Sequence, residues 1–170
     1  MLSVSFRAPE VSDEVKLGYA QRVMAREDFT FAFDFPPNDS FPNWLAKLND
    51  RRLGIGLLEW QVPSTFELAI VDARIAGRLS VRHSLNAQLL QKGGHVGYAV
   101  LPEFRQQGIG HRMMQRSLEI TASLGIARVL VTCDETNVAS RRIIESAGGI
   151  FESHHVGQSG DVPTRRYWIE

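Results

Sequence analysis

The chain has 170 residues, which suits one domain built around a single hydrophobic core. Hydrophobic residues make up 44% and charged residues 22%, values typical of globular proteins, and this excludes the disordered and fibrous classes. The 19 Lys and Arg residues balance the 19 Asp and Glu residues, and the resulting zero net charge argues against a nucleic-acid or membrane-surface partner.

Cysteine usage suits a reducing compartment, and hydropathy gives no sign of a membrane span or a signal peptide. Cys133 is the only cysteine, so the chain cannot form an internal disulfide. No segment approaches the roughly 18 apolar residues of a transmembrane helix. Residues 1–7 lack the basic and apolar regions of a signal peptide. We therefore expect a cytoplasmic protein with no membrane partner.

The chain begins with a predicted strand and two predicted helices. Residues 2–8 alternate in polarity, which indicates a short strand, and the apolar residues of 12–26 recur at helical spacing. A second helix is expected to begin near Ser40 or Pro42.

An aromatic segment separates the two helices. Phenylalanines occupy every second position from Phe29 to Phe35, which is the period of a strand. Pro36, Pro37 and Pro42 break any regular element that follows it.

From residue 66 onward the sequence alternates strands with helices. The predicted elements are strands at 66–71, 75–83 and 93–100, a loop at 86–92, a helix at 109–124, a strand at 129–133, a helix at 137–147, and strands at 150–152 and 165–169. They predict an α+β fold, with one mixed but mostly antiparallel sheet of six or seven strands flanked by about four helices. We expect residues 1–170 to form a single domain.

A glycine-rich loop joins the strand ending at Val100 to the next helix. Its sequence, residues 105–110, is Arg-Gln-Gln-Gly-Ile-Gly. Backbone N–H groups at a helix start, together with the helix dipole, favour an anion such as a phosphate. A P-loop would need Lys and Ser or Thr where His111 and Arg112 stand, and a Rossmann loop would need a small residue in place of Met113. Alone, the pattern also fits an ordinary turn.

Two blocks of sequence resemble the GNAT superfamily of acyl-CoA-dependent N-acetyltransferases. Residues 98–110 resemble its central motif, an apolar strand followed by Pro and then by Arg/Gln-x-x-Gly-x-Gly. The stretch from Thr132 to Ser140, followed by Ala-Gly-Gly at 147–149, is similar to its fifth strand and following helix. The likeness covers about residues 66–152, the expected cofactor-binding core. Residues 83–86, 93–98 and 166–169 narrow it to a group of uncharacterised predicted acetyltransferases.

The resemblance implies a GNAT-like fold and direct transfer of an acetyl group from acetyl-CoA to a small-molecule or peptide amine. A backbone N–H between Tyr98 and Val100 would polarise the thioester carbonyl. No metal is expected, and a homodimer is compatible because dimers are common in the superfamily. The implied cofactor contacts are Ala99, Val100, Arg105, Gln106, Gln107, Gly108, Ile109, Gly110, His111, Asn137 and Ser140.

The amine must lose a proton before it attacks, and His95, His83 and Glu67 are the candidate bases. His95 is preferred because it precedes Tyr98 on the same strand and titrates near neutral pH. Each of the three also fits a purely structural role. Arg82, His83 and Asn86 are expected to bind an anionic group of the acceptor if they are functional.

The acid that protonates the CoA thiolate is less defined. Many relatives have a tyrosine where this chain has Ile144, so Tyr98 is the predicted replacement, with Tyr167, Ser140 or water as alternatives. Cys133 is expected to be inert packing rather than a nucleophile. A second hypothesis is a catalytically silent CoA-binding sensor or interaction module, and a third is nucleotide-phosphate binding. The aromatic segment either lines an acceptor pocket or packs onto the sheet.

Overall fold

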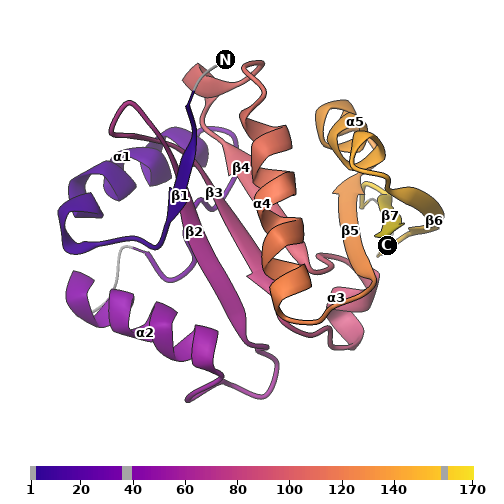
Figure 1. Cartoon of the computed structure of the whole chain (residues 1–170), viewed down its shortest axis with the longest axis horizontal. Coiled ribbons are helices and arrows are strands. Elements are labelled where there is room, and N and C mark those ends of the chain that lie inside the picture. The colour runs from indigo at the N-terminus through magenta and orange to yellow at the C-terminus, as the bar shows by residue number, and fades with distance from the viewer. Residues whose placement is uncertain (1–2, 36–39, 158–160) are drawn as a thin grey trace.

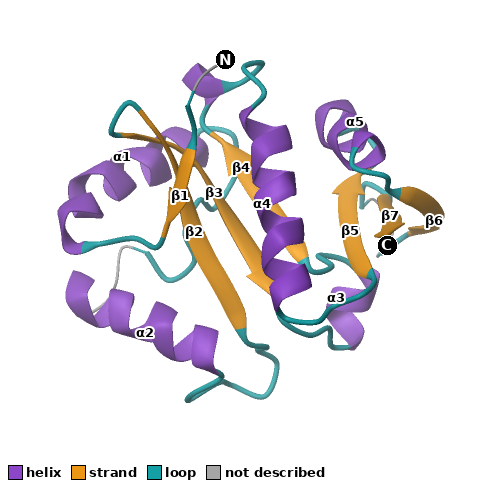
Figure 2. Ribbon diagram, viewed as in Figure 1, coloured by secondary structure: helices purple, strands orange, loops and turns teal. Residues whose placement is uncertain are grey.

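The computed structural model describes residues 3–35, 40–157 and 161–170 (Figures 1 and 2). Its strands form one sheet in the order β1-β2-β3-β4-β5-β7-β6. Every neighbouring pair is antiparallel except β4 and β5. The strands are β1 (Ser5–Arg7), β2 (Ser64–Val71), β3 (Arg74–Arg82), β4 (Val96–Val100), β5 (Val129–Asp134), β6 (Ile150–His155) and β7 (Thr164–Ile169).

Five α-helices accompany the sheet within the described residues. They are α1 (Glu14–Ala25), α2 (Phe41–Leu53), α3 (Ala87–Gln91), α4 (Ile109–Ser123) and α5 (Val138–Ser146), with short 3₁₀ turns at Val11–Asp13 and Pro102–Phe104. The predicted α+β class and mostly antiparallel sheet are confirmed. The additional helix is α3, which falls where a loop was predicted and starts at Asn86, whose Oδ1 accepts a hydrogen bond from the Leu89 N–H at 2.9 Å.

Side chains alternate between two covered faces of the sheet. Gly77 of β3 faces α4, because a Cβ added there would lie 2.2 Å from Met113 Cε. Phe66 of β2 faces the other side, where its ring packs edge-on against Trp44 of α2 with centroids 6.2 Å apart. Figure 2 shows α4 crossing one face of the sheet. The two faces are called below the α4 face and the α2 face.

The strand-like period at Phe29 to Phe35 does not correspond to a strand. This segment consists of bends and turns and pairs with no strand. Phe31 is fully buried, whereas the Phe35 ring packs edge-on against the rings of Phe41 and Trp44. The alternation therefore reflects packing of a loop on the sheet. Residues 36–39, which include Pro36 and Pro37, lie outside the described residues, as does residue 2 of the first predicted strand.

The core has two parts that meet near β4. The larger lies among β2, β3, α1, α2 and α4, and the smaller among β5, β7 and α5. Tyr98 packs against both. None of the helices formed by the described residues has both the length and the apolar character needed to cross a bilayer.

Candidate active site

The strands β4 and β5 lie side by side but separate along their length. Their register contains one residue pair, Val96 with Val131. Just before it, the His95 N–H donates to the Leu130 carbonyl at 2.7 Å, and the Gly93 N–H donates to the Thr132 hydroxyl at 3.0 Å. Beyond Val96 the two parallel strands are no longer paired, so the sheet opens between them.

The opening leaves backbone groups of β4 without a strand partner. The Arg82 N–H donates to the His95 carbonyl, and the Leu101 N–H donates to the Ala76 carbonyl. In an antiparallel ladder the residues that bond to one neighbour alternate with those that face away. The N–H groups of Tyr98 and Val100 therefore point toward β5, into the opening. The backbone of Ala99, a predicted cofactor contact, pairs instead with Arg78 of β3.

The loop at the end of β4 exposes a row of backbone amides. The first hydrogen bond of α4 runs from the Arg112 N–H to the Gly108 carbonyl, so the N–H groups of Ile109, Gly110 and His111 have no partner within the helix. Gly108 has φ +79°, and a Cβ added there would meet nothing within 4 Å. Gln106 also has a positive φ of 59°. Such a turn at the start of a helix favours an anion, because its free N–H groups converge and the helix dipole places partial positive charge there.

The two glycines of the loop have different functions. Gly108 supplies a left-handed conformation and open space. Gly110 is buried, and a Cβ there would lie 2.7 Å from Ile143 Cδ1 of α5. The second glycine therefore permits close packing of α4 on α5 rather than approach of a ligand.

Two side chains of the loop are already engaged. The Arg105 guanidinium makes two hydrogen bonds to the Glu27 carboxylate, at 3.0 and 2.6 Å, and its Nε donates to the Val100 carbonyl at 3.1 Å. Gln107 Nε2 donates to the Glu103 carbonyl at 3.0 Å. In this arrangement Arg105 and Gln107 fix the loop, and the backbone amides offer the free donors.

A hydrogen bond crosses the opening on the α4 face. The hydroxyl of Tyr98 lies 2.9 Å from that of Ser140 on α5. Burial raises the pKa of Tyr98 to about 12, although the bond to Ser140 acts in the opposite direction. The Asn137 Oδ1 accepts from the Ser140 N–H at 2.9 Å and so caps α5. Tyr98, Ser140 and Asn137 thus meet at the opening, as the sequence suggested, while their chemical roles stay predictions.

His95 lies on the α2 face at the closed end of the opening and is 7% exposed. Its Nδ1 accepts a hydrogen bond from the Leu130 N–H at 2.9 Å, so the ring is neutral and carries its proton on Nε2. Burial, and then the charge of Arg82, lower the pKa of His95. With its lone pair in use, the ring cannot take a second proton unless this bond breaks. The geometry counts against His95 as the base, which stays a prediction.

The other two candidate bases lie on the α4 face, away from His95. His83 Nε2 is 2.9 Å from the Thr65 hydroxyl, and burial lowers the pKa of His83. Glu67 is only 12% exposed at its side chain and binds the Arg116 guanidinium through both oxygens, at 2.8 and 2.9 Å. Both oxygens of the Glu67 carboxylate are therefore already used by Arg116.

The predicted acceptor residues are divided between the two faces. Arg82 and Asn86 line a cavity of about 340 Å³ on the α2 face, whereas adjacent His83 points to the α4 face. The side chain of Asn86 already has hydrogen-bond partners within the chain, because its Nδ2 donates to the Trp60 carbonyl at 2.9 Å and its Oδ1 caps α3. Sequence reasoning missed Arg78, which is 4% exposed and lies on the α2 face beside Arg82. Its spacing of four from Arg82 on a strand was the available signal.

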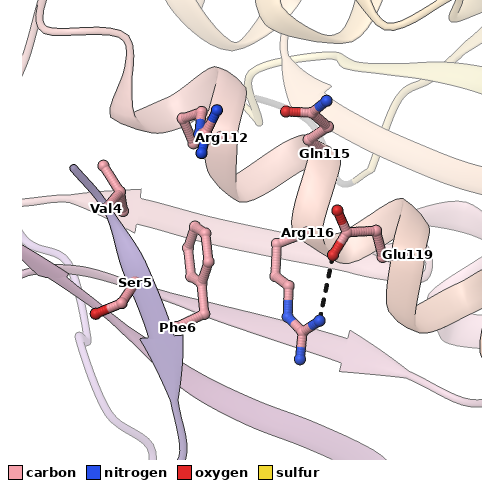
Figure 3. Close-up of a pocket in the computed structure, with 7 residues that line it drawn as sticks. All are labelled: Val4, Ser5, Phe6, Arg112, Gln115, Arg116 and Glu119. Atoms are coloured by element: carbon pink, nitrogen blue, oxygen red, sulfur yellow. Dashed lines mark hydrogen bonds and ion pairs between the residues drawn. The ribbon is translucent and has the colours of Figure 1, made fainter. Parts of the chain in front are cut away.

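A separate hollow of about 330 Å³ lies between β1 and α4 (Figure 3). Arg116 in it is paired with Glu67 at 2.8 Å and with Glu119 at 3.2 Å, so its charge is already balanced by the two acids. No residue of the loop or of the opening lines it, and we exclude it as the active site. The lining residues are Val4, Ser5, Phe6, Arg112, Gln115, Arg116 and Glu119.

Cys133 and the histidines offer no second centre. Burial raises the pKa of Cys133 to about 11, so its reactive thiolate is scarce at neutral pH. Across residues 3–35, 40–157 and 161–170, no group of three or more His, Cys, Asp or Glu side chains is arranged to hold a metal ion.

Comparison with known proteins identifies the architecture. The sequence profile of the family described as Acetyltransferase (GNAT) domain matches residues 4–150. The fold is similar to that of the yncA protein of Salmonella typhimurium, solved with its cofactor acetyl-CoA (TM-score 0.65, 14% identity, covering 98% of this chain and 93% of that one). It is also similar to the ribosomal-protein-S5-alanine acetyltransferase of Vibrio fischeri (TM-score 0.69, 14% identity, covering 98% and 92%).

A chimera of the spermidine N-acetyltransferase SpeG from Vibrio cholerae and hSSAT is a further structural neighbour (TM-score 0.63, 14% identity, covering 98% of this chain and 94% of that one). At such low identities the likenesses establish the fold alone. No curated protein matches the sequence significantly.

Proposed function

The chain belongs to the GNAT family of acetyltransferases, and from this premise we propose that it transfers the acetyl group of acetyl-CoA to a primary amine while both substrates are bound. The opening between β4 and β5, beside the amides at the start of α4, is the observation that carries the proposal. Residues 1–170 would act as one catalytic domain. A cytoplasmic location and a homodimer stay predictions.

The donor half of the site would bind acetyl-CoA mainly through backbone. The unpartnered N–H groups of Ile109, Gly110 and His111, with the space beside Gly108, fit a pyrophosphate. The unpaired edge of β4 at Tyr98 and Val100 fits the amide-bearing pantetheine arm, because it offers the hydrogen bonds of a missing strand. Acetyl-CoA supplies the acetyl group as a thioester, which an amine can attack directly.

The residues of β4 would provide the electrostatic part of catalysis. A backbone N–H of Tyr98 or Val100 is held rigidly by the β3–β4 ladder and points into the opening. A fixed donor at the place where negative charge develops on a carbonyl oxygen contributes about 10²–10³ in rate. Both N–H groups face β5, whereas the Val100 carbonyl is already used by Arg105.

Tyr98 would protonate the leaving thiolate. Its raised pKa of about 12 keeps the phenol protonated across the physiological range, and its hydroxyl stands in the opening with Ser140 as a relay partner. Ile144, where many relatives have a tyrosine, is completely buried in the smaller core and cannot take this role.

The amine would lose its proton to solvent rather than to a side chain. His95 is held by Leu130, and Glu67 is held by Arg116 on the opposite face. An amine with pKa near 10 is then acetylated faster as the pH rises, because its reactive neutral fraction grows about tenfold per unit. The pH profile would follow the amine itself.

The proposal is tested by measuring whether the protein acetylates an amine. Purified protein is incubated with acetyl-CoA and a panel of primary amines, thiol release is recorded, and products are identified by mass. Acetylated amine supports the proposal. Thermal stabilisation by CoA without acetylation of any amine would instead support a silent CoA-binding module, which the buried Ile144 and the engaged His95 favour. A hundredfold excess of CoA over its Kd corresponds to about 2.7 kcal/mol of stabilisation.

A further inference from the structure

Two arginines of β3 converge on one point of the α2 face. Arg78 and Arg82 are four residues apart, so their side chains leave the strand on the same side. A Cβ placed on Gly97 of β4 would lie 3.5 Å from Arg78 Nη1, and 3.7 and 3.8 Å from the two Nη atoms of Arg82. The two guanidinium groups therefore meet over Gly97.

Neither guanidinium has an acidic partner among the described residues. Arg78 Nε donates to the Phe31 carbonyl at 2.9 Å, and Arg82 Nη1 donates to the carbonyls of Gly93 and Gly94 at 3.1 Å. No carboxylate oxygen of the described chain lies within 4.0 Å of either. Two buried like charges without a counter-charge are costly to a fold.

Desolvation of the pair is pronounced. Arg78 is 4% exposed, and burial together with the neighbouring Arg82 lowers the pKa of Arg78 to about 10. The rings of Phe29 and Phe33 lie 5.3 and 5.8 Å from the Arg78 Cζ, which offsets part of this cost. Both arginines remain positively charged at neutral pH.

The Nη atoms of Arg78 have hydrogen-bonding capacity that the described residues do not use. In the described part of the chain, Arg166 Nε is the one fully buried side-chain nitrogen or oxygen that lacks a hydrogen bond. The Nη atoms of Arg78 make no hydrogen bond to the described residues, so they are not sealed from solvent. Their unused donors point to an anion that the described residues do not supply.

The space next to this pair is an apolar pocket. The cavity of about 340 Å³ has Arg82 and Ser80 among its lining residues, with the aromatic side chains of Phe33, Trp44 and Phe66 around them. Asp34, the one acid among the described residues that line it, is paired with Arg51 at 3.0 Å. Of the two arginines Arg82 lines this pocket, so a positive charge without an acidic partner among the described residues stands beside aromatic walls.

We propose that the acceptor amine carries a carboxylate, which Arg78 and Arg82 bind over Gly97, and an apolar group, which fills the adjacent pocket. The inference rests on the proposed acetyl transfer. Gly97 directly precedes the stretch of β4 whose N–H groups face the opening, so an amine attached to the bound carboxylate lies near the thioester. An amino acid with an apolar or aromatic side chain has all three parts. Polycationic amines are disfavoured by the same two charges.

The first measurement compares amines that differ only by the carboxylate. L-phenylalanine and phenethylamine form one pair, L-tryptophan and tryptamine another, and spermidine serves as the polycation. Each is assayed with saturating acetyl-CoA. Hydrogen bonds between charged groups favour the carboxylate member by about 10- to 100-fold in kcat/KM. Equal or higher kcat/KM for the decarboxylated members overturns the inference while leaving the acetyl-transfer proposal intact.

The second measurement uses a substitution that supplies the missing carboxylate from the protein. A Cβ at Gly97 is in ordinary contact with the guanidinium groups, and Gly97 does not need a positive φ, so Gly97→Asp is sterically allowed. We expect Gly97→Asp to abolish the carboxylate preference, whereas Gly97→Asn, of equal size and no charge, retains most of it. Equal effects of the two variants would show a steric effect and contradict the inference.

A matched pair of arginine variants completes the test. Arg82→Gln is expected to reduce the carboxylate preference at least about tenfold. Arg74→Gln, at the exposed start of the same strand, is expected to leave it unchanged. Unchanged preference in Arg82→Gln, with normal acetyl-CoA binding, counts against the proposal.

Calorimetry separates this inference from the reaction itself. Phenylalanine and phenethylamine are titrated into protein saturated with CoA, where no acetyl group can move. Tighter binding of phenylalanine in this titration, combined with no acetylation of any amine in the assay with acetyl-CoA, supports the carboxylate site and contradicts acetyl transfer. Failure of every carboxylate-bearing amine to bind or react better than its counterpart overturns the inference.

Discussion

The hydroxyl of Tyr98 on β4 lies 2.9 Å from the hydroxyl of Ser140 on α5, and this hydrogen bond spans two strands that have stopped pairing. It places a proton donor in the opening where the leaving thiolate is proposed to form. The bond also connects the two parts of the core, because Tyr98 packs against both. Its chemical and structural contributions can be separated by mutation.

Tyr98→Phe keeps the ring and removes the donor. We expect kcat to fall about 10²-fold, the low end for a general acid, while KM for acetyl-CoA changes little. The free energy of unfolding should fall by about 1 kcal/mol for the lost hydrogen bond. Ser140→Ala is the control, since it removes the partner but leaves the phenol. A kcat equal to wild type in Tyr98→Phe would exclude the acid role.

Gly110→Ala tests whether the second glycine of the loop serves packing. The new Cβ would lie 2.7 Å from Ile143 Cδ1 and would push α4 away from α5. Overpacking of this kind costs about 1–3 kcal/mol in chemical denaturation. Adding Ile143→Val removes the clashing methyl group and should restore most of the stability. A loss of stability that Ile143→Val does not reverse would contradict this packing role.

His95→Gln separates a base from a structural residue. Glutamine can still accept from the Leu130 N–H, so we expect kcat/KM to stay within about tenfold of wild type; loss of a true base costs about 10²–10⁴. Kinetics are followed from pH 6 to 9. A loss beyond 10²-fold together with disappearance of a pKa near neutrality would restore His95 as the base.

His95→Gln should also change how the free energy of unfolding depends on pH, in a direction that can be predicted. The folded state lowers the pKa of His95 below its ordinary value of 6.5, so the unfolded chain binds more protons just below that pH. This stability contribution is complete above about pH 6.5 and is lost as the pH falls through that value. Urea unfolding at pH 5 and 7.5 should show a smaller difference in His95→Gln. His83→Gln should reduce the difference in the same direction, because burial also lowers the pKa of His83.

Glu27→Gln tests how Arg105 contributes to the loop. If Arg105 anchors the loop through Glu27 and the Val100 carbonyl, the variant raises KM for acetyl-CoA a few-fold, in the same direction as Arg105→Gln. If Arg105 instead binds the pyrophosphate, releasing it from Glu27 tightens acetyl-CoA binding. Fluorescence or calorimetric titration of CoA distinguishes the two directions.

Much of the fold could be predicted from the sequence because its periodicity is strong. The helix after the glycine-rich loop, the strand pair around residue 73 and the cap at Asn137 all follow from local signals. The segment at Phe29 to Phe35 misled because alternation alone does not show whether a partner strand exists. Its phenylalanines pack against α2 and against Arg78, contacts that depend on tertiary structure.

The part of the site that is formed by backbone groups could be predicted from the sequence, whereas the part that is formed by side chains could be predicted less well. The loop sequence indicates free amides without knowledge of the fold. The pairing of Glu67 with Arg116, 49 positions apart, and the bond from Leu130 to His95 depend on which strands become neighbours. Because alternate residues of a strand face opposite sides of the sheet, the sequence alone would have placed His83 and Arg82 on different faces. The same rule would have placed Arg78 on the face of Arg82.

The single residue pair between β4 and β5 has a mechanical consequence. The half of the molecule that contains β5, β6, β7 and α5 is joined to the rest along a short seam, where Val96 meets Val131 and Gly110 meets Ile143. A ligand inserted between the strands would contact both parts and so couple the motion of one to that of the other. Hydrogen exchange should then slow in β5 and α5 on CoA binding, far beyond the atoms it touches. Protection confined to the loop would show that the seam is already rigid.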